Sequence, residues 1–168
     1  STAGNVAAAW GVAEADLESS AFAEGTKGAQ VREVTEAVKA VMEVKEAQVH
    51  GYTAVYLEGG AGQVKSQETN LGNLVADANL TAARSSSGGA LTDIVVSLVN
   101  GGTITGPIGE VAEGAEGVEK VAPQGYVPAG KSVGGISQLD VENALRGNRK
   151  LMVFDTTPMG LKALLEHG

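Results

Sequence analysis

The chain has 168 residues, of which 43% are apolar, and this is enough for one domain with a core of its own. Its net charge of −8 disfavours nucleic acids and anionic membrane surfaces as partners, because both are bound through basic patches. It contains no cysteine, which excludes disulfides and thiolate metal sites. No apolar run reaches the roughly 18 residues that span a bilayer, and the first residues lack the pattern of a signal peptide.

The N-terminal part has two predicted sections. Residues 1–28 are rich in Ala, Gly, Ser and Glu, which indicates a helical or flexible lead-in with short helices around 6–10 and 16–22. Residues 29–46 carry valines at helical spacing, including Val31, Val34, Val38 and Val41, and this spacing predicts one long helix.

A strand and an amphipathic helix follow. Near alternation of Val and Tyr predicts a strand over 48–57. The stretch SQETNLGNLVADANL (66–80) then predicts a helix with Thr69 or Asn70 as its N-cap. Asn70, Asn73 and Asp77 are poor residues for a helix interior, so they either anchor the helix or belong to a site.

The second half of the chain predicts strands alternating with helices. The apolar run 93–99 indicates a buried strand that ends at Asn100-Gly101-Gly102, after a loop over 84–89. Residues 106–135 are Gly-rich without a sustained period, which indicates a functional flap or a mobile surface loop. A helix capped by Ser137, a strand over 150–155 and a last helix starting at Thr157-Pro158 complete the pattern. The predicted fold class is α+β, with a mixed sheet flanked by helices.

No catalytic cluster is visible in the sequence. His50 and His167 are the only histidines, and neither lies in a metal-binding pattern, so a solvated or core-edge histidine is the simpler interpretation of each. The nucleophile elbow, the Walker loop and the dinucleotide fingerprint are all absent. A Ser-His-Asp triad stays open, because counting residues cannot exclude it.

Three local features are candidates for ligand binding. A strand that opens into Asn100-Gly101-Gly102 lets backbone N–H groups approach a ligand, although it also suits a plain turn. Lys65 precedes the helix and could meet an anion near the helix N-terminus, or it is an ordinary surface lysine. The run RGNRK contributes Arg146 and Arg149, which either bind a ligand or balance local charge in a solvated turn.

Three separated segments resemble the 5′-nucleotidase family. They are VKSQETNLGNLVADANLTAA (64–83), VSLVNGGTIT (96–105) and the segment 134–168, which begins GGISQLDVENAL. In order and spacing they are similar to the C-terminal, substrate-binding domain of these hydrolases, most closely in bacterial extracellular bifunctional metallophosphatase/5′-nucleotidase-like proteins. The resemblance covers about residues 31–168 and implies a periplasmic or extracellular location.

The resemblance also implies how the chain is organised. Members of the family join a metallophosphoesterase domain with two divalent metals, through a long helix, to a domain that binds the nucleotide. Residues 29–46 correspond to that linker helix, and 47–168 correspond to part of the C-terminal domain, truncated at its end. The implied chain therefore binds the substrate, holds no cofactor of its own and is inactive without the metal domain.

The family's binding residues are only partly retained. Lys65 stands where the family has an Arg, which keeps the charge but loses the bidentate fork. Asn100 matches a binding Asn, with Gly101 and Gly102 beside it. Thr105 replaces a binding Arg and Gly147 replaces a stacking Phe, while Arg146 or Arg149 could stack on a base instead.

Two further readings of function stay open at this point. The domain could be a degenerate, non-binding structural or assembly module of an extracellular protein, or a hydrolase of another class. An incomplete sheet would expose an edge, so we expect a partner: the metal domain, the remaining C-terminal segment or a second copy. Within the helix motif we expect Asn70 to cap the helix and Asn73 and Asp77 to tie it to neighbouring loops such as the one at Asn100. We expect only Lys65 to touch the ligand.

Overall fold

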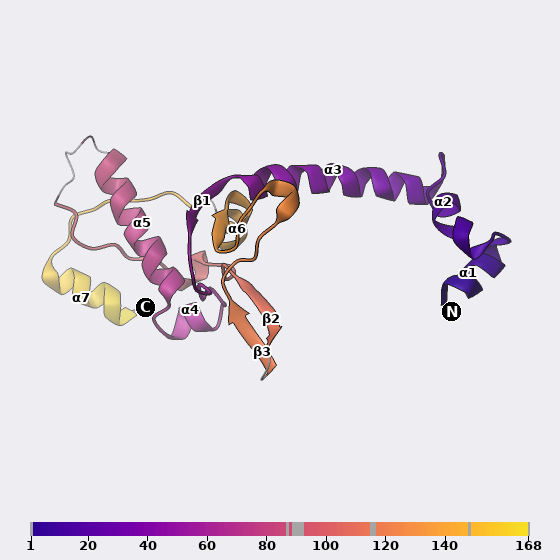
Figure 1. Ribbon diagram of the computed structural model, residues 1–168. Coiled ribbons are helices and arrows are strands. Elements are labelled where there is room, and N and C mark those ends of the chain that lie inside the picture. The colour runs from indigo at the N-terminus through magenta and orange to yellow at the C-terminus, as the bar shows by residue number, and fades with distance from the viewer. Residues whose placement is uncertain (1, 87, 89–92, 115–116, 148, 168) are drawn as a thin grey trace. The chain divides into compact units, whose positions relative to one another are not determined.

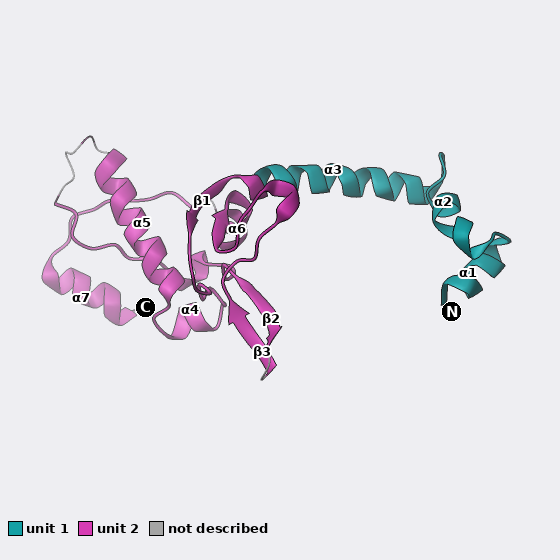
Figure 2. Cartoon of the chain, in the orientation of Figure 1, with its two compact units in different colours: residues 1–45 teal, residues 46–168 magenta. Residues whose placement is uncertain are grey.

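The computed structural model describes residues 2–86, 88, 93–114, 117–147 and 149–167. The chain divides into two compact units, residues 1–45 and residues 46–168 (Figure 2). The second unit contains all three segments that resemble the 5′-nucleotidase family.

The first unit is helical. It contains α1 (Thr2–Trp10), a 3-10 turn (Glu14–Asp16), α2 (Leu17–Ala21) and most of α3 (Lys27–Ala47), as Figure 1 shows. Thr26 caps α3, because its hydroxyl oxygen accepts a hydrogen bond from the Ala29 N–H at 3.1 Å. Arg32 joins α3 to α2, since it lies 3.7 Å over the Phe22 ring and 3.1 Å from Glu18.

The predicted long helix is confirmed, with bounds one or two residues wider than expected. None of the residues in α3 is buried, and the apolar stripe at Val31, Val34, Val38 and Val41 stays exposed. The helical spacing of the valines therefore predicted the helix correctly. It did not predict a buried face, because these valines are exposed in the chain.

The second unit is built on two small antiparallel sheets. β1 (Val49–Tyr52) pairs with β4 (Gly135–Ser137), with Val49 opposite Ser137 and a bulge before Gly51. β2 (Glu110–Gly114) and β3 (Gly117–Val121) form a hairpin, drawn in orange in Figure 1. The α+β class is confirmed. The mixed sheet is not found, because every strand pair among the described residues is antiparallel.

The strand predictions agree less well with the structure than the helix predictions do. The strand predicted at 48–57 ends at Tyr52, and the strands predicted at 93–99 and 150–155 are absent from the described residues. These two apolar runs have no regular secondary structure, and Val95 and Met152 are each 80% exposed. A strand is defined by its partner, and neither run pairs with another described segment.

The Gly-rich region and the helix α5 contain more regular structure than the sequence predicted. Residues 106–135 were expected to lack regular structure, yet they contain the β2–β3 hairpin. The helix α5 (Asn70–Ser86) runs two turns beyond the motif and includes residues expected in a loop. The predicted helices α6 (Gln138–Ala144) and α7 (Pro158–His167) are confirmed, and Thr157 accepts a hydrogen bond from the Gly160 N–H as an N-cap does.

The core of the second unit is small. It lies where α5 meets the segments around Leu57, Ile104 and Ile108 and the end of α6. The buried residues in it are Leu57, Leu71, Val75, Ile104, Ile108 and Ala144. Burying side chains of this size contributes roughly 1.5–3 kcal/mol each, so few residues carry the stability of this unit.

Lys131 lies at the centre of a polar cluster outside that core. Its side chain is only 5% exposed, and its ammonium group lies 2.6 Å from Glu46 and 3.0 Å from Asp140. Asp140 also accepts hydrogen bonds from the Ser137 N–H and hydroxyl, which completes the capping box of α6. Burial on its own lowers the pKa of Lys131, but its hydrogen bonds to the two carboxylates outweigh burial and hold the pKa above its usual value.

We expect Lys131→Met to lower the free energy of unfolding by about 3 kcal/mol, because two partly buried carboxylates would lose their counter-ion. The exposed Lys162, which pairs with Glu166 on α7, supplies the control Lys162→Met with a change below about 0.5 kcal/mol. Urea unfolding of the full chain measures both.

The pH dependence of the same variant is a second readout. Because the folded state raises the pKa of Lys131, the stabilisation is fully present below about pH 10.4 and is lost as the pH rises through the folded pKa. The difference between wild type and Lys131→Met should therefore stay constant from neutral pH to about pH 9 and shrink at higher pH. A difference that vanished at neutral pH would show that the cluster does not stabilise the fold.

Candidate functional site

The start of α5 is held by two adjacent residues with different tasks. Thr69 is the N-cap, because its hydroxyl oxygen accepts a hydrogen bond from the Gly72 N–H at 3.1 Å. Of the two predicted N-caps, Thr69 is therefore the residue found, and Asn70 is the first residue of the helix, with its side-chain oxygen accepting from the Leu71 N–H at 2.9 Å. Its side-chain oxygen accepts from the Glu58 N–H at 2.7 Å, and its amide nitrogen donates to the Tyr56 carbonyl at 2.9 Å. Asn70 therefore ties α5 to the segment 56–58.

The polar stripe of α5 does not reach the Asn100 turn as expected. Asn73 donates a hydrogen bond of 2.7 Å to the Glu68 carboxylate, and Asp77 is exposed. The Asn100 side chain serves its own turn, since its oxygen accepts from the Gly102 N–H at 2.7 Å. Asn73 therefore ties the helix to the segment just before it, and not to the Asn100 turn.

The Asn100 turn nevertheless packs directly against the element that carries Lys65. That element is the short helix α4 (Gln63–Ser66), and the turn is the 3-10 segment Gly101–Thr103. A Cβ atom on Gly101 would lie 2.3 Å from the Val64 carbonyl oxygen and 3.4 Å from the Lys65 Cα. Only glycine allows this approach. The Asn100 turn and the helix that carries Lys65, both predicted from the sequence as candidates for ligand binding, therefore lie side by side.

A cleft of about 200 Å³ lies next to this contact, between α4, α5 and the turn. Val64, Val99 and Ile104 supply apolar surface, and Gln67, Glu68 and Asn73 supply polar groups. The remaining lining residues are Thr69, Gly72, Ala76 and Gly101. Lys65, Asn100, Gly102, Arg146 and Arg149 are not among the lining residues.

Sequence reasoning missed the polar residues of the cleft. Gln67 and Glu68 attracted no hypothesis, and Asn73 was interpreted only as an anchor of the helix. The signal that could have found them is their place in the motif that also carries Lys65. They sit within eight positions of it, and the turn from α4 into α5 brings them to one side.

The end of α6 approaches the same region through Thr105. The Thr105 hydroxyl donates to the Asn143 carbonyl at 2.8 Å, and its backbone N–H donates to the Ala144 carbonyl at 2.8 Å. Thr105 thus satisfies carbonyl groups that the end of a helix leaves without partners. The residue at the position of a family arginine therefore has a structural task here.

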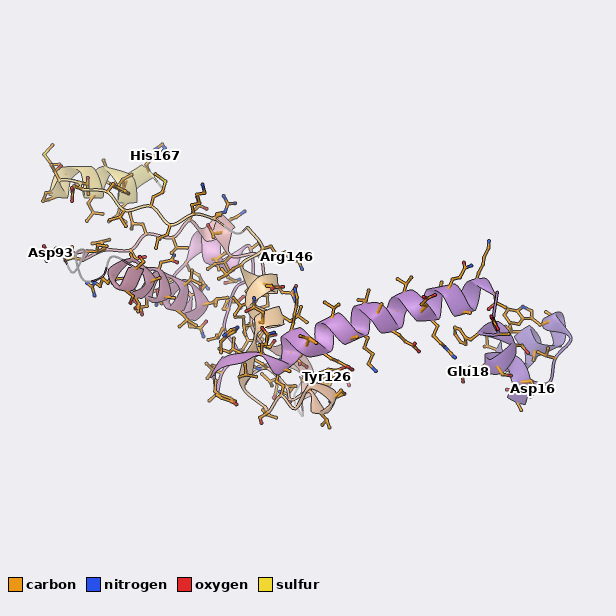
Figure 3. All side chains as sticks on the ribbon, turned by 90° about the horizontal axis from the view of Figure 1, so that it is seen from above. Asp16, Glu18, Asp93, Tyr126, Arg146 and His167 are labelled. Carbon is orange, nitrogen blue, oxygen red and sulfur yellow. The ribbon has the colours of Figure 1, made fainter. Side chains whose placement is uncertain are left out.

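Arg146 and Arg149 follow this helix end, and Figure 3 labels Arg146 beside α6. Both are exposed. The Arg146 guanidinium lies 3.4 Å from the Asn143 side-chain oxygen, and a Cβ on Gly147 would lie 3.0 Å from the Arg149 Nε. Neither arginine lines the cleft.

Another cation close to the start of α5 is already paired. Lys120 of β3 forms an ion pair with Glu58 and lies 5.1 Å from the centre of the Tyr56 ring. The hydrogen bond from Lys120, followed by that from the Gly60 N–H, lowers the pKa of Glu58. Burial raises the pKa of Tyr56, and Glu58 adds to this. This contact fastens the β2–β3 hairpin to the segment that Asn70 holds.

Within the described residues, no three His, Asp or Glu side chains lie together in a way that could hold a metal ion. His50 is exposed and lies 2.7 Å from the Gln138 side-chain oxygen. None of the helices in the described part of the chain is long and apolar enough to cross a membrane.

Comparison with known proteins relates the chain to nucleotide phosphoesterases. It is 31% identical over 126 residues to the trifunctional nucleotide phosphoesterase protein YfkN of Bacillus subtilis, and the match covers 75% of this chain. The chain spans only 7% of the length of that relative. No family model matches the chain, and no solved structure matches it at a significant level. The similarity is consistent with the 5′-nucleotidase-like relationship that the three sequence segments predict.

The contact between Gly101 and α4 can be tested by substitution. Gly101→Ala should lower the free energy of unfolding by about 1–3 kcal/mol, because the added methyl group meets a backbone carbonyl that cannot move without shifting α4. Gly62→Ala is the matched control, since nothing lies within 4 Å of its Cβ position, and its change should stay within about 0.5 kcal/mol. Equal effects of the two variants in urea unfolding would contradict the packing described.

Proposed function

We propose that this chain is the nucleotide-binding part of a 5′-nucleotidase-like phosphoester hydrolase, corresponding to its C-terminal, substrate-binding domain. The observation that carries the proposal is the convergence of the family-like segments. Gly101 of the Asn100 turn and the start of α5 line one cleft next to the short helix that carries Lys65, in a chain similar to a nucleotide phosphoesterase. The chain on its own performs no hydrolysis, and a metallophosphatase domain with divalent metals supplies that step.

Different exposed residues contact the phosphate and the base of the nucleotide. Lys65 attracts the phosphate, and the Asn100 turn packs against the helix that carries Lys65. Arg146 or Arg149 contacts the base by cation–π stacking, in place of the aromatic residue that Gly147 replaces. Such a cation–π contact contributes about 0.5–1 kcal/mol at an exposed site.

A second candidate function is a structural or assembly module that no longer binds nucleotides. Thr105 favours it, because this residue stands at a family arginine position and its hydroxyl is engaged with the end of α6. The two candidates make opposite predictions for nucleotide binding, so one titration separates them.

We further propose that the chain acts with a protein partner in the periplasm or outside the cell. Large apolar side chains of the second unit support this, since Met152 is 80% exposed and Met159 is 84% exposed. The partner is the metallophosphatase part, the remaining C-terminal segment or a second copy of this chain. Sedimentation of the purified chain distinguishes the second copy from the other two, because only a second copy gives a dimer.

Calorimetric titration with AMP tests the proposed function. We expect measurable binding by the wild type and a loss of affinity of about 10- to 100-fold in Lys65→Met, because a charge-assisted hydrogen bond contributes about 1.5–3 kcal/mol. Lys65→Arg should bind at least as well as the wild type, since it restores the bidentate fork. Lys162→Met is the control, and it should leave the affinity unchanged.

Two outcomes would count against this proposal. Absence of AMP binding at millimolar concentration would favour the structural module. Hydrolysis of AMP by the isolated chain with added divalent metal would contradict the assignment of the chemistry to another domain.

A further inference from the structure

The cleft between α4, α5 and the Asn100 turn is lined by one carboxylate, that of Glu68, and by the side-chain amides of Gln67 and Asn73. The Asn73 amide nitrogen donates to Glu68 Oε1, and the Gln67 amide nitrogen donates to Gln63 at 2.6 Å. Each of these bonds uses one of the two N–H groups of its amide and orients that amide, while the Glu68 carboxylate can only accept hydrogen bonds. The second carboxylate oxygen of Glu68 is an acceptor as well, and it carries charge.

The charge and size of the cleft restrict its ligand. A carboxylate repels phosphate, so the phosphate group belongs at Lys65 and not in the cleft. The volume of about 200 Å³ is below the range of roughly 300–1,000 Å³ that holds whole drug-sized ligands, which suits a group of the size of a sugar ring. Val64, Val99 and Ile104 add apolar surface for the carbon side of such a ring.

We propose that Glu68, oriented by Asn73, accepts hydrogen bonds from the vicinal hydroxyl groups of a ribose and thereby selects ribonucleotides over 2′-deoxyribonucleotides. A carboxylate has two oxygen atoms that can each accept one bond from a vicinal diol, and the 2′-hydroxyl is the group that a deoxyribose lacks. This inference rests on the proposed function and deepens it, because it adds a sugar site to the phosphate contact at Lys65.

The geometry of Glu68 supports a role in orientation as well as in contact. Its side chain is exposed to solvent, yet the 2.7 Å bond from Asn73 fixes one carboxylate oxygen across the first turn of α5. Asn73 is in turn fixed by the helix, whose cap Thr69 is buried. Asn73 is therefore a positioning residue, and Glu68 is the residue that contacts the sugar.

The test compares AMP with 2′-deoxy-AMP by calorimetry on the full chain. We expect the wild type to bind AMP about tenfold more tightly than 2′-deoxy-AMP, because a hydrogen bond to a charged group is lost with the 2′-hydroxyl. In Glu68→Gln this ratio should fall to within about twofold, with the affinity for 2′-deoxy-AMP retained. Glu113→Gln on the exposed β2 strand is the matched control and should keep the tenfold ratio.

Asn73→Ala separates positioning from contact. It should reduce the ratio only in part, because Glu68 keeps its charge but loses its orientation. Thermal unfolding of each variant shows whether it is folded, and the ratio in the wild type tests the inference even if a variant is not.

The outcomes distinguish this inference from the proposed function. Equal binding of the two nucleotides by the wild type, or an unchanged ratio in Glu68→Gln, would overturn the sugar site and leave nucleotide binding intact. Failure of both nucleotides to bind would overturn the proposed function and the sugar site with it.

Discussion

One side-chain amide completes the backbone pairing on which the second unit is built. The Leu57 N–H and carbonyl pair with Ile108 at 2.9 and 3.0 Å, while the neighbouring Tyr56 carbonyl and Glu58 N–H point the other way. The side-chain amide of Asn70 bonds to both of those groups, its oxygen to the Glu58 N–H and its nitrogen to the Tyr56 carbonyl, just as the peptide group of an adjacent strand would. Residues 56–58 are therefore satisfied on both edges, although only one edge faces another segment of backbone.

This arrangement also positions the core and the cleft. Leu57 and Leu71 are drawn together because Asn70 fixes the first turn of α5 beside residue 57, and Ile108 closes the group from the other side. The same turn carries Thr69, Gly72 and Asn73 into the cleft. The motif that resembles the 5′-nucleotidase family thus joins a structural residue, Asn70, to residues that face the candidate ligand site.

Local physics explains which parts could be predicted from the sequence. The helices α3, α5, α6 and α7 could be predicted from apolar residues at helical spacing and from caps such as Ser137 and Thr157. Both signals act within a few residues of the chain. A strand needs a partner that can lie far away in the sequence. The apolar runs 93–99 and 150–155 therefore could not show by themselves whether they form strands. Lys131 could not be identified either, because Glu46 lies 85 positions away and the lysine sits in a Gly-rich stretch. In the site, Lys65 and Asn100 were found separately, whereas the cleft depends on how α4, α5 and the turn pack.

The two exposed apolar runs have a consequence for the behaviour of the chain in solution. Asp93 precedes the first run, and Lys150 and Asp155 bound the second. Charges at the ends of apolar segments act as gatekeepers, because stacking such segments into fibrils would bring like charges together without water. We therefore expect the charges of Asp93, Lys150 and Asp155 to oppose aggregation of these two exposed apolar runs.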